Sequence, residues 1–253
     1  MLKTLTIEAG HGKDGKPETF SSMTLLPGNL YAVAGNTGAG KSRFIKDIEQ
    51  LADGDSVTGR KIRINGAAVP KEKRLSLSAS LVAHLSQNMR FVLDLTVRDF
   101  LALHCRCREK KTDGLSSLLE DIIRTANTIT PEPIRLTDSL NLLSGGQSRA
   151  LMAADIAMVC DSPIVLIDEI ENAGINKKAA LQLLADQKKL VLLVTHDPHT
   201  ALMAKERILI KNGAVFARKT RTKEEETLFL ALDRQYEDTM RLQSRLRKGE
   251  NLI

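Results

Sequence analysis

The stretch Gly35-Asn36-Thr37-Gly38-Ala39-Gly40-Lys41-Ser42 fits the pattern G-x-x-x-x-G-K-[ST]. A short apolar, β-prone run at residues 30–34 precedes it, and apolar residues at helical spacing follow at 44–48. Glycines let successive backbone N–H groups point at one anion, and the N-terminus of a following helix adds its positive end. The order of strand, glycine loop and helix therefore predicts a phosphate-binding loop at residues 35–42.

The pattern also gives a role to two side chains of this loop. Lys41 would reach the β- and γ-phosphates of a nucleoside triphosphate, and the hydroxyl of Ser42 would bind Mg²⁺. The alternative is a glycine-rich turn that contains Gly-Lys-Ser by chance. The strand and helix on either side favour the nucleotide site.

The composition indicates a globular chain with a sizeable core. It has 253 residues, of which 42% are hydrophobic. We expect a soluble, cytoplasmic chain, because no apolar stretch is long enough to span a bilayer and the N-terminus lacks the apolar segment of a signal peptide. Three cysteines, Cys105, Cys107 and Cys160, suit a reducing compartment, and we interpret Cys105 and Cys107 as ordinary thiols.

The net charge of +6 permits an anionic partner without requiring one. The chain contains six Phe, two Tyr and no Trp, so an aromatic surface for stacking nucleic-acid bases is poorly supported. We therefore expect no nucleic-acid partner.

Hydrophobic patterns divide the chain. Continuous apolar runs at 164–167 and 190–194 are typical of central parallel strands, and alternating residues near the N-terminus predict an additional antiparallel layer. The predicted domains are a nucleotide-binding α/β core with its β subdomain at residues 1–87 and 141–222, an inserted helical subdomain at 88–140 and a charged C-terminal helical tail at 223–253.

Five stretches follow one another in order: GNTGAGKS at 35–42, Gln87, LSGGQ at 143–147, IVLIDE at 164–169 and THD at 195–197. In this combination the chain resembles the ATP-binding cassette (ABC) ATPases over nearly its whole length. Of the five stretches, LSGGQ best distinguishes the ABC ATPases from other P-loop families, because many of those families share the glycine loop and an acidic residue after a strand. The resemblance implies an α/β fold of the P-loop NTPase class, ABC type, with a mainly parallel core sheet, an antiparallel β layer and an inserted helical subdomain.

The resemblance also implies an ATPase that uses ATP and Mg²⁺. Asp168 matches the Walker B aspartate, which holds Mg²⁺ with Ser42, and Glu169 matches the glutamate that polarises the attacking water. Gln87 matches the Q-loop glutamine, which reports on the γ-phosphate and the metal, and His196 matches the switch histidine. Taken singly, Gln87 could be a surface residue and His196 a capping or core residue. Their positions after strands favour the catalytic interpretation.

The LSGGQ stretch resembles the family signature, which completes the ATP site of a second subunit. Ser144, Gly145, Gly146 and Gln147 would then bind the γ-phosphate at a helix N-terminus. The resemblance implies a head-to-tail homodimer that closes around two ATP molecules and opens after hydrolysis.

The chain departs from the family pattern in two places. After Glu169 the sequence reads Ile170-Glu171-Asn172-Ala173-Gly174-Ile175-Asn176, so the usual D-loop aspartate is missing or replaced by Asn176. No aromatic residue matches the one that stacks on adenine; His11 is nearest by position and Phe20 lies further along.

The resemblance leaves three functions open. The chain could power a membrane transporter by docking on a separate permease at the inner face of the membrane. It could instead be a soluble ABC ATPase that assembles a cofactor or remodels a protein complex, as the unusual D-loop and the charged tail suggest. A DNA-maintenance ATPase is disfavoured, because the long coiled-coil or zinc insertions of that class are missing. Of these three functions, we expect the chain to be the ATP-binding subunit of a transporter.

Overall fold

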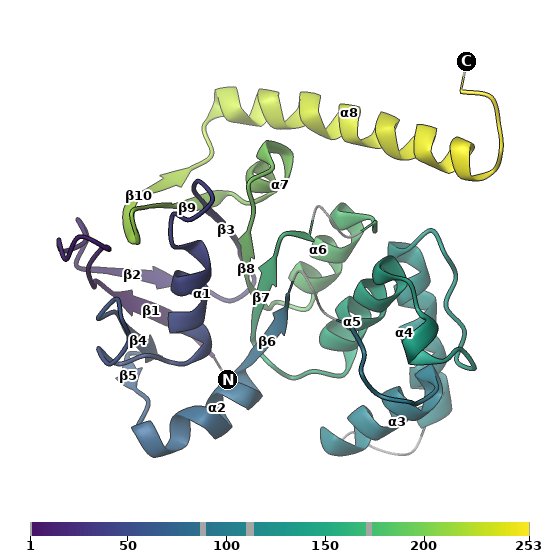
Figure 1. Cartoon of the computed structure of the whole chain (residues 1–253), viewed down its shortest axis with the longest axis horizontal. Coiled ribbons are helices and arrows are strands. Elements are labelled where there is room, and N and C mark those ends of the chain that lie inside the picture. Colours follow the sequence, from purple (N-terminus) through teal and green to yellow (C-terminus); the bar gives the residue numbers. More distant parts are fainter. Residues whose placement is uncertain (1, 87–89, 110–113, 171–173, 253) are drawn as a thin grey trace.

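A computed structural model of the chain describes residues 2–86, 90–109, 114–170 and 174–252. Two β-sheets, one on each side of helix α1 (Lys41–Glu49), form the half of the molecule that carries the N-terminus, and helices α3 to α6 form the other half (Figure 1). The long C-terminal helix α8 crosses one end of the molecule.

The larger sheet has six strands, of which the five from β6 to β9 in spatial order are parallel. The edge strand β10 pairs with β9 in antiparallel orientation through a turn at Asn212-Gly213. Both turn residues have positive φ angles, 51° and 82°, which is the conformation that two-residue hairpins require. In spatial order the strands are β10 (Ala214–Thr220), β9 (Glu206–Lys211), β3 (Leu30–Ala34), β8 (Leu190–Val194), β7 (Ile164–Asp168) and β6 (Val82–Leu85).

The central strands are apolar throughout because both faces of this sheet are covered. Ile164 and Leu166 of β7 belong to an apolar cluster shared with α1 and the smaller sheet. Val165 and Ile167 belong to a second cluster, which is shared with the helical half. Alternate residues of one strand thus face two cores. The prediction of central parallel strands at 164–167 and 190–194 is confirmed by the observed β7 and β8.

The smaller sheet is antiparallel and packs beyond α1. Its hairpin turns at Asn65-Gly66, where both φ angles are positive, 53° and 82°, as a two-residue hairpin requires. The strands, in spatial order, are β2 (Ser22–Leu25), β1 (Leu5–Glu8), β4 (Lys61–Ile64) and β5 (Ala67–Ala68).

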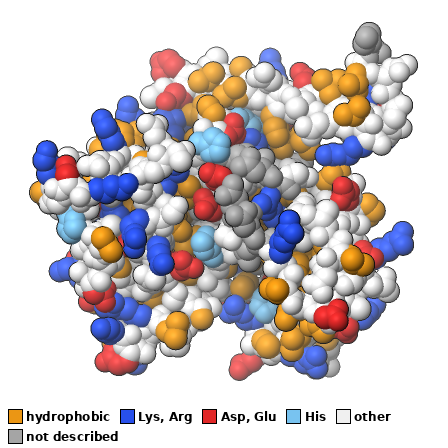
Figure 2. All heavy atoms as spheres, viewed as in Figure 1, with side chains coloured by type: hydrophobic (Ala, Val, Ile, Leu, Met, Phe, Trp, Pro, Cys, Tyr) orange, Lys and Arg blue, Asp and Glu red, His pale blue; other side chains and the backbone are white. Residues whose placement is uncertain are grey.

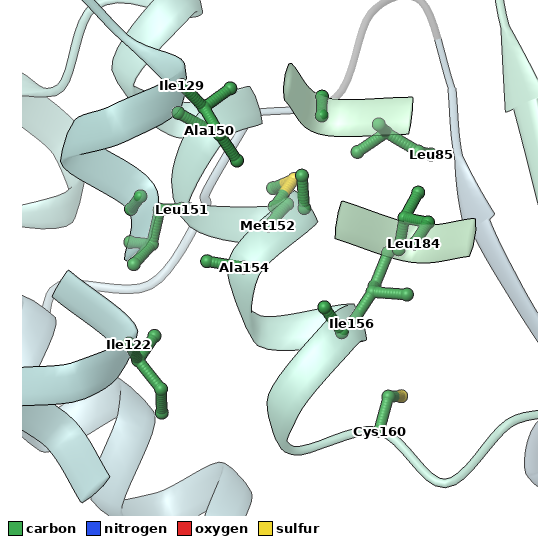
Figure 3. Close-up of a cluster of buried hydrophobic side chains, with 14 of the residues drawn as sticks. Leu85, Ile122, Ile129, Ala150, Leu151, Met152, Ala154, Ile156, Cys160 and Leu184 are labelled. Carbon is green, nitrogen blue, oxygen red and sulfur yellow. The ribbon is translucent and has the colours of Figure 1, made fainter. Parts of the chain in front are cut away.

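Helix α5 (Gly145–Met158) is the centre of the helical half. Its buried residues surround the helix, and Figure 3 shows α4 residues Ile122 and Ile129 on one side of it and Leu85 and Leu184 on the other. The alanines of α5 let these neighbours approach closely. The other helices here are α3 (Val97–Cys107), α4 (Leu115–Ile129) and α6 (Lys177–Asp186).

Three helices complete the fold: α2 (Arg74–Leu81), α7 (Pro198–Met203) and α8 (Lys223–Arg247). Short 3-10 helices lie at Lys71–Lys73 and Leu140–Leu142. Across the described part of the chain, no helix combines the length and apolar character needed to cross a membrane.

Candidate active site

The glycine loop joins the end of β3 to the start of α1, as the sequence predicts. A Cβ atom at Gly35 would overlap the carbonyl oxygen of Ile210, and a Cβ atom at Gly40 would lie 2.8 Å from the Cα atom of Gly213. Gly40 also has a φ angle of 107°, which few other residues adopt. Glycine is therefore needed at both positions because the β9–β10 hairpin packs directly against the loop.

The side chain of Lys41 folds back over this loop. Its Nζ donates hydrogen bonds to the carbonyl oxygens of Gly35, at 2.8 Å, and of Asn36, at 3.1 Å. These are neutral acceptors, and a phosphate oxygen is a stronger partner for an ammonium group. Lys41 is thus held at the mouth of the loop, in reach of an anion that enters it.

The loop opens into a pocket of about 520 Å³, within the size range of small-molecule sites. Lysine and arginine side chains from two segments line it together with two carboxylates. Such a lining attracts a polyanion and leaves acceptors for a cation. The lining residues are Lys13, Thr37, Gly38, Gly40, Lys41, Ser42, Arg43, Lys46, Asp168, Glu169 and Val194.

The space-filling view shows where charged side chains gather on this face (Figure 2). Lys and Arg side chains gather over α1 and the smaller sheet, and acidic and histidine side chains meet near the middle of this face.

Asp168 and Glu169 stand at the C-terminal edge of the parallel sheet. Asp168 is the last residue of β7 and pairs in register with Val194 of β8, and the amide of Glu169 donates to the carbonyl of Val194 at 3.0 Å. The acidic pair is therefore tied to β8, the strand that leads to His196.

The backbone of Glu169 adopts an uncommon conformation. Its φ angle is 49°, in the left-handed region that side chains other than glycine rarely adopt. Such strain is common at functional sites, where the surrounding structure holds it.

His196 faces Glu169 across the end of the sheet. Its Nδ1 lies 3.5 Å from Oε1 of Glu169, and 59% of the histidine side chain is exposed against 25% of the glutamate. A second pocket, of about 420 Å³, opens between them and the glycine loop and shares Thr37 and Glu169 with the first. The structure therefore brings the glycine loop, Asp168, Glu169 and His196 together around two adjoining pockets.

A partly buried ion pair fixes the segment that carries His196. Lys177, the first residue of α6, donates from Nζ to Oδ2 of Asp197 at 2.6 Å and to Oγ1 of Thr200 at 2.8 Å. Burial alone would raise the pKa of Asp197, but the hydrogen bonds from Lys177 and Thr200 outweigh burial and lower that pKa to about 2. Asp197 therefore stays ionised and continues to cap α7.

The signature residues form the N-terminus of α5. Ser144 and Gln147 make a capping box, with a bond of 2.9 Å from the Ser144 amide to the Gln147 side chain and one of 3.2 Å from the Gln147 amide to the Ser144 hydroxyl. Ser144 also donates to Glu132 at 2.8 Å. Among residues 144–147, all of which are described, none lines either pocket. One chain thus keeps its signature apart from its own glycine loop.

Two expectations fall in segments without a described structure. Gln87 lies outside the described residues, as do residues 171–173 of the D-loop region. Asn176, the possible replacement for the D-loop aspartate, is the N-cap of α6, where its side chain accepts from the Ala179 amide at 3.1 Å. Aspartate and asparagine serve equally well as N-caps, so this substitution preserves the start of the helix.

Three cationic side chains of the pocket were not predicted from the sequence. Arg43 and Lys46 are three residues apart on α1 and so lie on one side of it, which the helical spacing could have revealed. Lys13 reaches the pocket from a loop far away in the sequence, and no local pattern indicates it.

Comparison with known proteins identifies the family. The family model described as ABC transporter matches residues 20–172. An uncharacterized ABC transporter ATP-binding protein of Methanocaldococcus jannaschii is 43% identical, over 99% of this chain and 95% of that protein. The macrolide export ATP-binding/permease protein MacB of Campylobacter jejuni is 25% identical over 83% of this chain, and the match spans 33% of MacB.

The fold is similar to that of a solved structure. The structure of CbiO1 from Clostridium perfringens, described as part of the ABC transporter complex CbiONQ, matches with a TM-score of 0.67 at 17% identity. This match covers 98% of this chain and 100% of CbiO1. The chain therefore belongs to the ABC transporter family, as one of its ATP-binding, ATP-hydrolysing proteins.

Proposed function

We propose that this chain binds Mg-ATP in the cation-lined pocket and hydrolyses it at composite sites of a head-to-tail homodimer, as the ATP-binding subunit of a transporter. The observation that carries the proposal is the pocket itself, in which the glycine loop meets the carboxylates of Asp168 and Glu169. His196, whose Nδ1 lies 3.5 Å from Oε1 of Glu169, completes the group of side chains to which we assign roles in hydrolysis.

Residues 35–42 would hold the triphosphate through their backbone amides and the ammonium group of Lys41. Ser42, Asp168 and Gln87 would hold Mg²⁺, and the donor set of hydroxyl, carboxylate and amide oxygens suits this hard cation. When bound, Mg²⁺ supplies charge neutralisation for the phosphates. Glu169 would accept a proton from the attacking water, and His196 would orient the glutamate.

The second half of each site would come from the partner chain. Ser144, Gly145, Gly146 and Gln147 lie at a helix N-terminus, and Ser144 and Gly145 are exposed. A helix N-terminus favours an anion. Because these residues do not line the pocket of their own chain, a γ-phosphate in a neighbouring chain is their natural ligand.

Relatives favour the transporter over a soluble remodelling ATPase. MacB joins an ATP-binding part to a permease in one protein, and CbiO1 is part of a transporter complex. We propose that this chain docks on a separate permease at the cytoplasmic face of a membrane. The docking groove would lie near Gln87 and the inserted helical subdomain at residues 88–140. In the proposed domain division, residues 1–87 and 141–222 are the core and 223–253 are the tail.

The proposed chemistry is tested by Glu169→Gln. We expect this variant to bind Mg-ATP with unchanged affinity and to hydrolyse it at least about 100-fold more slowly, since a positioned general base contributes roughly that factor or more. With hydrolysis blocked, the ATP-bound dimer should persist on size-exclusion chromatography. Glu72→Gln, at an exposed position in the 3-10 helix before α2, is the matched control and should behave as wild type. Wild-type turnover by Glu169→Gln would refute Glu169 as the base.

A further inference from the structure

Lys13 places a second ammonium group on the glycine loop. Its Nζ donates a 2.7 Å hydrogen bond to the carbonyl oxygen of Gly38, and its side chain lines the same pocket as Lys41. The two lysines thus bind different carbonyls of one loop, and each is held by neutral acceptors. An anion in the loop would offer both of them a stronger partner.

The backbone around Lys13 is fixed to the phosphate-binding loop through the β9–β10 turn. The amide of Lys13 donates to the carbonyl of Asn212 at 2.8 Å, and the amide of Gly213 donates to the carbonyl of Ala39 at 2.7 Å. A Cβ atom at Gly12 would lie 2.9 Å from the Asn212 oxygen. This close packing defines where the Lys13 side chain begins.

A buried carboxylate anchors the other end of the loop that carries Lys13. Glu18 accepts from the amide of Gly10 at 2.9 Å and from the amide of Val215 at 2.5 Å. It also pairs with the fully buried Arg60 at 2.6 Å. The segment from Gly10 to Glu18 is therefore held at both ends, so little backbone entropy is lost when Lys13 binds a ligand.

The charge of Lys13 is available to a ligand. Within the described part of the chain, no carboxylate forms an ion pair with it. Lys16 in the same loop differs, because its ammonium lies 3.8 Å from the carboxylate of Asp14 and its side chain is 83% exposed. Lys16 also does not line the pocket, as far as the described residues define it.

Among the described residues that line the pocket, none has an aromatic side chain on which a base could stack. His11 lies against Gly59, where a Cβ atom would be 3.3 Å from the imidazole, and Phe20 packs on the apolar cluster around α1. Neither residue nearest to the expected adenine position reaches this pocket, so binding must depend more heavily on the phosphates.

We propose that Lys13 is a second phosphate-binding lysine of the nucleotide site, so that recognition rests on the phosphate chain more than on the base. This inference rests on the proposed function, because it needs a triphosphate in the pocket. It predicts that the adenine and guanine nucleotides bind with similar affinity and that both depend on the charge at position 13.

The test measures binding of AMP-PNP, GMP-PNP and inorganic tripolyphosphate to the full chain by isothermal titration calorimetry. Lys13→Ala should weaken all three by a similar factor, about tenfold, because a charge-assisted hydrogen bond is lost in each case. Lys13→Gln keeps a donor for the Gly38 carbonyl without the charge and should weaken binding equally. Lys13→Arg should restore it, and the control Lys16→Ala should bind as wild type.

The outcomes separate this inference from the proposed function. If wild type binds nucleotide and Lys13→Ala binds it equally well, the role of Lys13 is overturned and the site stands. If Lys13→Gln binds like wild type, the lysine only supports the loop and the proposal is wrong. If wild type binds none of the three ligands, the nucleotide site and the role of Lys13 are both refuted.

Discussion

Arg60 is fully buried and joins three parts of the fold. It pairs with Glu18 at 2.6 Å and with Asp47 of α1 at 3.0 Å, and it donates to the carbonyl of Gly213 at 2.6 Å. Its guanidinium also lies 5.2 Å from the centre of the Phe44 ring. Burial alone would raise the pKa of Glu18, but hydrogen bonds from Arg60 and two backbone amides outweigh burial and lower that pKa, so this carboxylate is ionised. Helix α1 is thus tied to the loop of Lys13 by buried charges.

Removal of Arg60 should therefore lower the stability of the fold. Arg60→Met leaves the two carboxylates buried without their cation, and we expect the free energy of unfolding to fall by roughly 3–5 kcal/mol. Arg63→Met is the matched control, because Arg63 pairs with Glu8 and Asp53, which are partly exposed. This substitution should lower the free energy of unfolding by only about 1 kcal/mol. Urea denaturation measures both. Equal losses in the two variants would show that burial of the Arg60 cluster is unimportant.

At the scale of elements, His104 links α3 to the signature helix α5. Its Nδ1 lies 2.8 Å from Oδ1 of Asp155, and its ring stacks on Phe100 with centroids 6.1 Å apart. The hydrogen bond to Asp155, followed by one to Cys160, raises the pKa of His104 to about 9. This histidine has no motif in the sequence, and its contacts give it a structural role.

This pair makes the packing of α3 on α5 dependent on pH. The pKa of His104 is higher in the folded chain than its unfolded value of about 6.5. The contribution of the His104–Asp155 pair to the free energy of unfolding is therefore complete below about pH 6.5 and is lost as the pH rises through about 9. We expect Asp155→Asn to lower the free energy of unfolding by roughly 1–3 kcal/mol at pH 6 and by much less at pH 10.

Urea denaturation at the two pH values measures this difference. The control is Glu120→Gln, an exposed carboxylate on α4, which should change stability little at either pH. A loss in Asp155→Asn that is the same at pH 6 and pH 10 would contradict a charged His104.

The C-terminal helix α8 is held on the body beside the segment that carries His196. Asp233 accepts from Lys178 of α6 at 2.7 Å and lies 3.2 Å from Nε2 of His199 in α7. Tyr236 covers Lys177, whose ammonium lies 4.9 Å from the ring centre. The tail therefore packs on both helices that carry the Lys177–Asp197 pair.

At the scale of the whole molecule, the signature and the glycine loop lie in different places on one chain. The glycine loop, Asp168 and Glu169 share a pocket, and residues 144–147 do not line it. Burial of the α5 body between α4, β6 and α6 holds the signature in a fixed position. A head-to-tail pair of chains would unite the two halves, and the composite site would occur twice in the single interface between them.

Ser144→Arg tests this arrangement. A bulky side chain at the exposed N-terminus of α5 should leave ATP binding by one chain intact. It should prevent ATP-dependent dimerisation, because it would occupy the space that the nucleotide of the partner chain would take. Loss of the serine cap should cost only about 1 kcal/mol of stability. Multi-angle light scattering with a non-hydrolysable ATP analogue measures the dimer.

The matched control is Ser117→Arg, the same change at an exposed position in the first turn of α4. It should dimerise as wild type. An unchanged dimer in Ser144→Arg would refute the composite site, while loss of nucleotide binding itself would indicate that Ser144 supports the fold of its own chain.

The sequence by itself determined the features that depend on short-range geometry. The glycine loop, the turns at Asn65-Gly66 and Asn212-Gly213, and the apolar strands β7 and β8 follow from local backbone preference and from burial on both faces. The positions of Asp168, Glu169 and His196 after strands followed as well, because parallel strands end at one edge. Helix α2 was not predicted, since none of its residues is fully buried and only Leu77 and Leu81 pack on the apolar cluster around α1.

Only the tertiary structure decided which distant side chains complete the site. Lys13 meets Gly38 across 25 positions of sequence, and Arg60 meets Glu18 across 42. Such contacts depend on how the hairpin β9–β10, the N-terminal loop and α1 pack together, and no pattern within one segment records that packing. Local chemistry thus specified where a phosphate would bind, and long-range packing determined the charges that surround it.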